Sequence, residues 1–281
     1  MHHEYYPDRY YLTIGSHEPV LRVENGDSVA TLTLDAGGRD LNGEIKSERG
    51  NPQTGPIFVD GAKVGTVLAV TLEHVWPNRE HGFCRPRIAP NVLEPGHDTG
   101  LYDNEPFDFV LDFQSKTASI ANPSKGLKSL KVPIRPMIGC FGVAPDRGQA
   151  ISTATSGPHG GNMDYRGFEP GVTAYFPVFV EGALFHIGDG HAWQSDGEIL
   201  GTGIEIPMDV TFSFKVIEGR KIDWPRGQNK EYIFIHGAKY KLPDQKILIS
   251  CYHPSPRNVN TGRLTKNMML KLLIDLKKYS K

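Results

Sequence analysis

Cysteine is scarce in this chain. Its 281 residues include only Cys84, Cys140 and Cys251, and no two of them form a Cys-x-x-Cys pair. An odd and sparse set of cysteines argues against a disulfide framework and fits a reducing compartment, so we expect a cytoplasmic protein. Without paired thiolates we expect no zinc site of the cysteine type.

The sequence also lacks an excess of charge of either sign and lacks long hydrophobic runs. It has 31 basic and 32 acidic residues, and no run of Lys or Arg alternates with aromatics, so we expect no nucleic-acid partner. Its most apolar window, Tyr175 to Phe185, contains a proline, a glutamate and a glycine. That window is far shorter than the roughly 20 apolar residues of a membrane helix, so we expect no membrane association. The first seven residues do not have the pattern of a secretory signal.

Several well-known catalytic motifs are absent. There is no Gly-x-Ser-x-Gly nucleophile elbow and no phosphate-binding GxxxxGK[ST] loop. No strand is followed by a GxGxxG fingerprint, which excludes kinases, GTPases and dehydrogenases of the usual kinds. Cys140 lies in the apolar segment Ile138 to Gly142, and we interpret it as a small core residue rather than a nucleophile.

What the sequence has in excess is turn residues and alternating hydrophobicity. The 31 glycines and 21 prolines exceed average usage and favour a β-rich fold with many loops. Period-two alternation predicts strands at residues 67–75, 107–113, 178–187 and 204–216, with Pro207 marking an edge or a bulge. Apolar residues at helical spacing predict one helix at residues 264–276, capped by Thr261 or Thr265.

These patterns predict a mainly β protein with a β-sandwich fold of jelly-roll-like type and a smaller α+β part at the C-terminal end. We place the β-rich catalytic region at residues 1–219, because the alternation stops after Gly219. Residues 220–281 then form the small α+β segment that ends in the helix.

The polar residues most able to carry chemistry lie between residues 159 and 205. Asp189 and His191 are two positions apart, so in an extended chain they point from the same face toward one point. A carboxylate oxygen and an imidazole nitrogen are both good zinc ligands. Asp-Gly pairs are also common in turns, but carboxylates this dense are rarely buried without a partner or a metal. His159, Asp164 and Glu205 are the further candidate ligands.

Two upstream segments have alternative interpretations. Residues 51–56, Asn-Pro-Gln-Thr-Gly-Pro, form either a rigid turn between strands or a loop that lines a small polar pocket. Asp35 begins an Asp-Ala-Gly-Gly segment and is either a turn residue or a further metal ligand.

At these positions the sequence resembles the acetamidase/formamidase family. The resemblance rests on ordered blocks at residues 51–56, 136–145, 159–164 and 188–205, and it covers residues 23–219 best. It implies a β-rich sandwich-like fold, hydrolysis of short aliphatic amides to a carboxylate and ammonia, and a divalent metal, zinc first with calcium as the alternative. It also implies a set of site residues: His159, Asn162, Asp164, Asp189, His191, Glu198 and Glu205.

We take Asp189 and His191 as core ligands, with His159 or Glu205 completing the shell. Glu198 is the hypothetical catalytic base, which takes a proton from metal-bound water and passes it to the leaving nitrogen. Asn162 is the second catalytic candidate, as a hydrogen-bond donor to the substrate amide or the developing oxyanion. The expected partner is a small amide substrate, and we expect a homo-oligomer, most simply a dimer.

Two departures from the family pattern favour alternatives. Ser195 stands where the resemblance leads us to expect a glycine, and the sequence ends soon after its predicted helix. One alternative is therefore a non-enzymatic β-sandwich module that binds metal, and another is a hydrolase of a different small amide or ester. Calcium prefers oxygen ligands, so histidine ligands would argue against a purely structural calcium site.

Overall fold

A computed structural model describes residues 1–85, 105–198, 200–228, 239–241, 247–249, 265–276 and 278. The chain contains two compact units, Met1–Gly227 and Gln228–Lys281, whereas the sequence predicts a boundary after Gly219. The predicted helix cap Thr261, the predicted first helical residue Leu264 and Cys251 lie outside the described residues.

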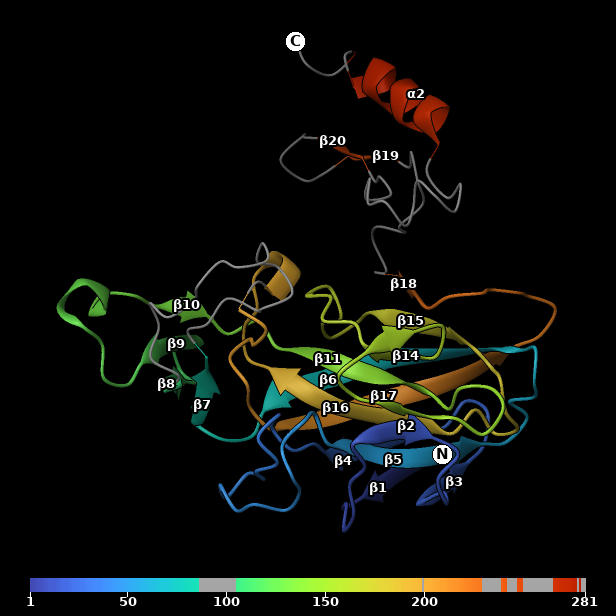
Figure 1. Ribbon diagram of the computed structural model, residues 1–281, viewed down its shortest axis with the longest axis horizontal. Helices are drawn as coiled ribbons and strands as arrows, with labels where there is room; N and C mark the ends of the chain where they lie inside the picture. Colours follow the sequence, from blue (N-terminus) through green and yellow to red (C-terminus); the bar gives the residue numbers. More distant parts are fainter. Residues whose placement is uncertain are drawn as a thin grey trace, which may run out of the picture. The chain divides into compact units, whose positions relative to one another are not determined.

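The larger unit is built on two six-stranded sheets (Figure 1). The first has the order β1-β4-β17-β6-β15-β18. Its members are β1 (His2–Tyr5), β4 (Ser28–Leu32), β17 (Met208–Ile217), β6 (Val67–Pro77), β15 (Thr173–Pro177) and β18 (Arg226–Gln228). Only the β1–β4 pair is parallel among the pairings recorded for this sheet. Strand β17 alternates buried and half-buried positions over most of its length, because one face of the sheet covers the core, whereas β6 is buried at most of its positions.

The second six-stranded sheet has the order β13-β14-β11-β16-β5-β3. Its members are β13 (Ser156–Gly157), β14 (Gly160–Asn162), β11 (Met137–Val143), β16 (Phe185–His191), β5 (Gln53–Val59) and β3 (Leu21–Val23). Strands β11 and β16 are buried at every position. Both lie inside the sheet, and β16 carries the Asp189 and His191 side chains of the predicted site.

One hydrophobic core joins the two sheets face to face. Phe185 on β16 lies 5.3 Å from Phe212 on β17, measured between ring centroids, and Phe141 on β11 lies 5.5 Å from Phe176 on β15. All four are fully buried members of the same cluster. Ring pairs of this kind add to the free energy of burial and fix the orientation of the layers. The predicted mainly β sandwich is confirmed.

Smaller sheets complete the unit. One has the order β10-β9-β8-β7, with β10 (Val132–Pro133), β9 (Thr117–Ile120), β8 (Phe107–Asp112) and β7 (His81–Cys84). A two-stranded sheet pairs β12 (Ala150–Ser152) with β2 (Thr13–Gly15). Two short 3-10 helices, η2 (Lys125–Leu127) and η3 (Asp196–Glu198), lie in loops.

The smaller unit contains a two-stranded sheet of β19 (Lys239–Lys241) and β20 (Ile247–Ile249), and the helix α2 (Lys266–Leu276). The helix confirms the C-terminal helix prediction. Thr265 caps it, since its Oγ1 accepts a hydrogen bond of 3.2 Å from the backbone N–H of Met268. Leu272 is buried, whereas Leu270, Leu273 and Ile274 are more than half exposed.

Two predicted strands differ from the structure. Residues 178–184 form a loop rather than the start of one long strand, and Ala183 and Leu184 have φ near +55°, which a strand does not allow. Strand β17 begins only after Pro207, because proline has no N–H to donate. It lies inside the sheet rather than at its edge, and it carries a bulge between Thr211 and Phe212.

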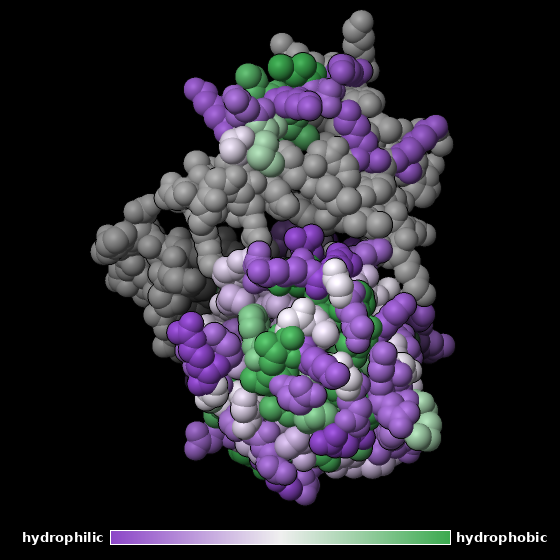
Figure 2. Space-filling view, turned by 90° about the vertical axis from the view of Figure 1, so that its right-hand side faces the viewer, coloured by the Kyte–Doolittle hydropathy of each residue, from purple (hydrophilic) through white to green (hydrophobic). Residues whose placement is uncertain are grey.

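The described residues contain no helix long and apolar enough to cross a membrane. Figure 2 shows that hydrophilic side chains predominate on one face of the described surface, with hydrophobic ones gathered in smaller groups among them.

Candidate metal centre

The end of strand β16 carries the Asp-x-His pair beside a glycine of β11. Met137 on β11 pairs with His191 on β16, and Asp189 has a positive φ of 60°. On the other side of β11, the backbone carbonyl of Gly139 accepts hydrogen bonds from the N–H groups of Met163 and Asp164. Because Gly139 has no side chain, Asp164 and the pair on β16 can face each other across it.

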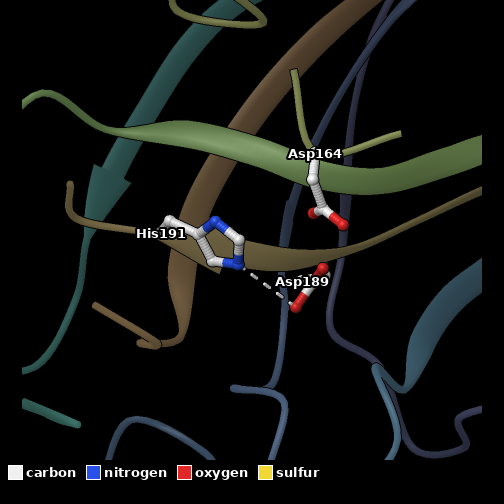
Figure 3. A group of neighbouring side chains, drawn as sticks. All are labelled: Asp164, Asp189 and His191. Carbon is white, nitrogen blue, oxygen red and sulfur yellow. Dashed lines mark ion pairs between the residues drawn. The ribbon is translucent and has the colours of Figure 1, made fainter. Parts of the chain in front are cut away.

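Two groups of potential ligand atoms meet at His191. Asp164, Asp189 and His191 form one, and His191, Glu198 and Glu205 form the other, with the atoms in each group within 4.8 Å of one another. Figure 3 shows the carboxylate of Asp164 pointing toward that of Asp189, which a dashed line joins to the imidazole of His191. The Nε2 atom of His191 lies 3.5 Å from Asp189 Oδ1. It also lies 3.1 Å from Glu205 Oε1 and 3.8 Å from Glu198 Oε1.

Glu205 reaches this point because its segment extends the sheet at the end of β16. Residue 205 forms isolated bridges to His191 on one side and to Phe83 of β7 on the other. Its neighbours Ile204 and Ile206 belong to the core, and the Glu205 side chain points to the opposite face. The Oε1 atom of Glu205 accepts a 2.8 Å hydrogen bond from the N–H of Gly203.

Burial of these carboxyls shifts their pKa values upward. Burial, reinforced by neighbouring carboxylates, raises the pKa of Asp164 to about 6, that of Glu205 to about 7 and that of Glu198 to about 8. Burial acts to lower the pKa of His191, but the charges of Glu205 and Asp189 outweigh it and hold that pKa well above the usual range. Without a cation the site therefore favours protonated carboxyls, and a bound cation would stabilise their charged forms.

The donor atoms fit a divalent metal. Asp164 Oδ1 and Glu205 Oε2 are buried and have no hydrogen-bond partner among the described residues. A buried carboxylate oxygen without a partner is costly, and the two residues belong to different ligand groups, so a metal ion in either group would satisfy one of them. A set of one imidazole nitrogen and several carboxylate oxygens suits zinc, and the imidazole makes a purely oxygen-liganded calcium site a poorer description.

A residue that sequence reasoning did not single out, Gln194, orients the histidine. Its Oε1 lies 2.7 Å from His191 Nδ1, and its Nε2 donates a 2.6 Å hydrogen bond to the carbonyl of Asp164. That second bond fixes which end of the amide is the oxygen, so Nδ1 of His191 must be the protonated nitrogen. Nε2, the atom facing the carboxylates, is then the one available to a metal. The only sequence signal is that Gln194 follows His191 by three residues.

The two asparagines at the site hold the carboxylates. Asn162 donates from Nδ2 to Asp164 Oδ2 at 2.5 Å, and its Oδ1 accepts from Asn51 Nδ2 at 2.8 Å. Asn51 Nδ2 also lies 3.2 Å from Asp189 Oδ2. Of the two interpretations of residues 51–56, the loop that lines a polar pocket fits Asn51, while the following residues enter β5.

These residues line one cavity of about 170 Å³. Besides the carboxylates and His191 it is lined by Asn51 and Asn162, which the sequence analysis singled out, and by residues that it did not: Ala36, Arg49, Gly50, Phe83, Arg85, Gly201 and Thr202. Cys84 and Cys140 are not among them, and burial raises the pKa of the Cys140 thiol, which fits a core residue.

Asp35 and His159 belong to neither ligand group. Asp35 is fully buried, and its oxygens accept hydrogen bonds from the N–H groups of Gly37 and Arg39 and from the guanidinium of Arg79. This is the geometry of a turn residue, and it anchors the loop that leads to Asn51. The imidazole of His159 is buried, and neither of its nitrogens has a hydrogen-bond partner among the described residues.

The hydrogen bond from Gln194 leads to a prediction about metal affinity. We expect Gln194→Ala to weaken zinc binding by about 10- to 100-fold, since the histidine loses the partner that fixes its tautomer. Zinc titration against a competing chelator measures this. Gln194→Glu keeps an acceptor for Nδ1 and should bind zinc more tightly than the alanine variant. Gln114→Ala, on the surface, is the matched control. Equal zinc affinity in Gln194→Ala and the wild type would contradict the role.

The raised carboxyl pKa values lead to a prediction about stability. A carboxyl with a higher pKa in the folded protein than in the unfolded chain lowers the free energy of unfolding once the pH passes its unfolded value. The folded value for Glu198 is about 8 against an ordinary 4.5. The raised pKa of His191 acts in the same direction, because its favourable charge is lost as the pH rises. The free energy of unfolding of the metal-free protein should therefore fall as the pH rises from about 4.5 to about 8.

Thermal melts in chelator, compared at pH about 5 and about 8, measure this effect. We expect the melting temperature to fall by about 5–10 °C, since a few kcal/mol are involved in a unit of this size. Saturating zinc should reverse most of the fall. Glu205→Gln should flatten the dependence, whereas Glu181→Gln, an exposed glutamate, should not. A melting temperature in chelator that rises with pH would contradict the prediction.

The fold and the site define a class: a β-sandwich protein with a histidine–carboxylate centre suited to a divalent cation. Comparisons with known proteins then give the family. The model of the acetamidase/formamidase family matches residues 147–237, which include His159 and every residue of both ligand groups. Together with the solved relatives described next, this match shows that the chain belongs to the acetamidase/formamidase family.

Two solved structures share the fold. The recombinant predicted acetamidase/formamidase from the thermophile Thermoanaerobacter tengcongensis is 32% identical with a TM-score of 0.67, over 82% of this chain and 74% of that chain. The acetamidase from Yersinia enterocolitica is 31% identical with a TM-score of 0.69, over 82% of this chain and 72% of that chain.

Curated relatives are longer than the matched part of this chain. The acetamidase of Mycolicibacterium smegmatis is 30% identical over 213 residues, which is 70% of this chain and 52% of that protein. A relative from Schizosaccharomyces pombe is 24% identical, and the chain covers 61% of it. The chain thus spans about half to three fifths of these relatives. A 45-residue stretch is also 47% identical to the type-5 uracil-DNA glycosylase of Thermus thermophilus, over 16% of this chain and 20% of that protein, which is a local likeness only.

Proposed function

We propose that this protein hydrolyses short aliphatic amides, such as formamide and acetamide, to a carboxylate and ammonia, with a divalent metal held at His191. The observation that supports this most is the convergence of four carboxylates on one imidazole nitrogen inside a cavity, in a chain of this family. We propose zinc as the metal, with Asp164, Asp189 and His191 as its principal ligands and Glu205 beside them.

A bound zinc ion would polarise the amide carbonyl and make water a better nucleophile at neutral pH. The remaining tasks fall to the side chains. Glu198 lines the cavity, and its raised pKa of about 8 places it where a carboxyl can both accept and donate a proton near neutral pH. It can take a proton from the attacking water and return it to the departing nitrogen, without which ammonia is a poor leaving group.

Asn162 and Asn51 have a different part. Asn162 donates one N–H to Asp164 and accepts from Asn51, which holds the carboxylates in place. Its amide carries a second N–H, which is able to donate to the carbonyl oxygen of a bound amide. The cavity of about 170 Å³ accommodates a small amide.

Ammonia release from formamide and acetamide by the full chain tests the proposal. We expect release by the protein as isolated, loss after chelation, and recovery when zinc is restored, because the carboxylate cluster needs its cation. A panel of other short amides and esters is assayed in the same way. Turnover of one of these instead of formamide or acetamide would identify a hydrolase with a different substrate. If the protein binds stoichiometric zinc but turns over no substrate in the panel, the proposal is overturned. The alternative of a non-enzymatic metal-binding module would then be favoured.

A further inference from the structure

Two arginines line the same cavity as the metal-site residues. Arg49 is exposed and lies at the end of the loop that Asp35 anchors, and Arg85 is half-buried and follows strand β7. They come from segments far from the Asp-x-His pair in the sequence. Neither was singled out by any pattern, because isolated arginines in loops are common and are normally solvated.

The backbones of both arginines are held in place. The residue after Arg49, Gly50, donates its N–H to Ala36 and accepts a 2.6 Å hydrogen bond from Thr153 Oγ1 at its carbonyl. The N–H of Arg85 donates a 2.9 Å hydrogen bond to Thr202 Oγ1, and Thr202 also lines the cavity. The two side chains therefore start from fixed points on the cavity wall.

Their guanidinium groups lack ion-pair partners. Within the described part of the chain, no carboxylate lies within 4.0 Å of the Arg49 or the Arg85 side chain, whereas Arg79 pairs with Asp35 at 2.7 Å. Burial is the main cause that lowers the pKa of Arg85, and the like charge of Arg49 lowers it further. The negative charge of Glu205 raises that pKa, but it is the smallest of the three effects. Arg85 is thus not paired with the metal-site carboxylates.

A half-buried guanidinium beside another one is unfavourable unless an anion joins them. Arginine binds carboxylates with paired hydrogen bonds in a fixed planar geometry, so two arginines form a strong recognition element for that group. The cavity volume equals that of about five or six water molecules, which is more than formamide or acetamide would fill.

We propose that Arg49 and Arg85 form a carboxylate-binding subsite, and that the preferred substrate is a short dicarboxylic acid monoamide, with its amide at the metal centre and its free carboxylate on the two arginines. This inference rests on the proposed amide hydrolysis. The reaction breaks the C–N bond and forms a C–O bond from water, so the products are a dicarboxylate and ammonia, and nothing is oxidised or reduced.

The test compares charged substrates with neutral ones of equal length in the zinc-loaded full chain. Malonamate and succinamate carry the carboxylate, and malonamide and succinamide replace it with a second amide. We expect kcat/KM for the charged member of each pair to exceed that of the neutral member by about ten- to a hundredfold. Arg85→Gln and Arg49→Gln should each lower this ratio of kcat/KM values by at least about tenfold. Arg147→Gln, an exposed arginine outside the cavity, should leave it unchanged.

A binding measurement separates this inference from the proposed activity. Calorimetry should show malonate binding to the wild-type protein about tenfold or more tightly than acetate, with the difference lost in the Arg85 and Arg49 variants. If malonate behaves so but no amide is hydrolysed, the subsite stands and the amidase proposal fails. If neutral amides are hydrolysed as well as charged ones and the variants change nothing, the amidase proposal stands and the subsite is overturned.

Discussion

Gly139→Ala is expected to abolish zinc binding and to lower kcat/KM about 1000-fold while the sandwich stays folded. A Cβ atom at residue 139 would lie 2.5 Å from Asp164 Oδ1 and 2.7 Å from Asp189 Oδ2, and it would approach the His191 ring at 3.2 Å. The methyl group would thus occupy the space toward which three ligand candidates point. Since a bound metal supplies several kcal/mol of transition-state stabilisation, its loss gives a rate effect of this order.

This substitution is a sharper test than removing a ligand. It deletes no carboxylate and no imidazole, and Gly139 does not have a positive φ, so alanine can adopt its backbone conformation. Zinc stoichiometry, ammonia release and the melting temperature in chelator are measured together. Gly126→Ala is the control, because a Cβ there meets nothing within 4 Å. Full zinc binding and turnover in Gly139→Ala would show that the metal does not lie among Asp164, Asp189 and His191.

Glu198→Gln is expected to lower kcat about 10²- to 10⁴-fold with zinc still bound, which is the usual contribution of a positioned acid–base group. Glutamine keeps the shape of the side chain and one oxygen, but it cannot take up and return a proton. Glu198 is the least buried of the four carboxylates and the farthest from His191 Nε2 of the three measured to that atom. These features favour a proton carrier over a principal ligand.

Zinc content and the pH dependence of kcat separate the two roles. A proton carrier predicts unchanged zinc content and loss of the limb of the pH profile that reports Glu198. Loss of zinc together with activity would instead make Glu198 a ligand, and full turnover with zinc bound would exclude it from the reaction. Glu181→Gln, an exposed glutamate on a loop, should match the wild type in every measurement.

The local patterns predicted a large part of the fold. Alternating hydrophobicity places strands at residues 67–75 and 107–113, and β6 and β8 occupy these segments because each has a buried face. The same reasoning failed at residues 178–187. There an apolar run crosses a turn, and apolar composition alone does not distinguish a buried loop from a buried strand.

The candidate site shows a similar division. The spacing of Asp189 and His191 predicts one shared point, and the two side chains do meet there, although Asp189 has a φ of 60° rather than the extended backbone that the prediction assumes. Asp35 could not be assigned from sequence, since an Asp-Ala-Gly-Gly segment suits a turn and a site equally well. Its hydrogen bonds to Gly37, Arg39 and Arg79 are those of a turn residue.

The sequence by itself determined the class of the fold, the family, and the pairing of Asp189 with His191. These follow from periodicity and short motifs, which act between residues close together in the chain. Only the tertiary structure decided that Glu205 meets His191 while His159 lies outside both ligand groups, that Gln194 orients the imidazole, and that two loop arginines share the cavity. Those outcomes depend on which loops the packed sheets bring together, and contacts between distant segments leave no spacing in the sequence from which to infer them.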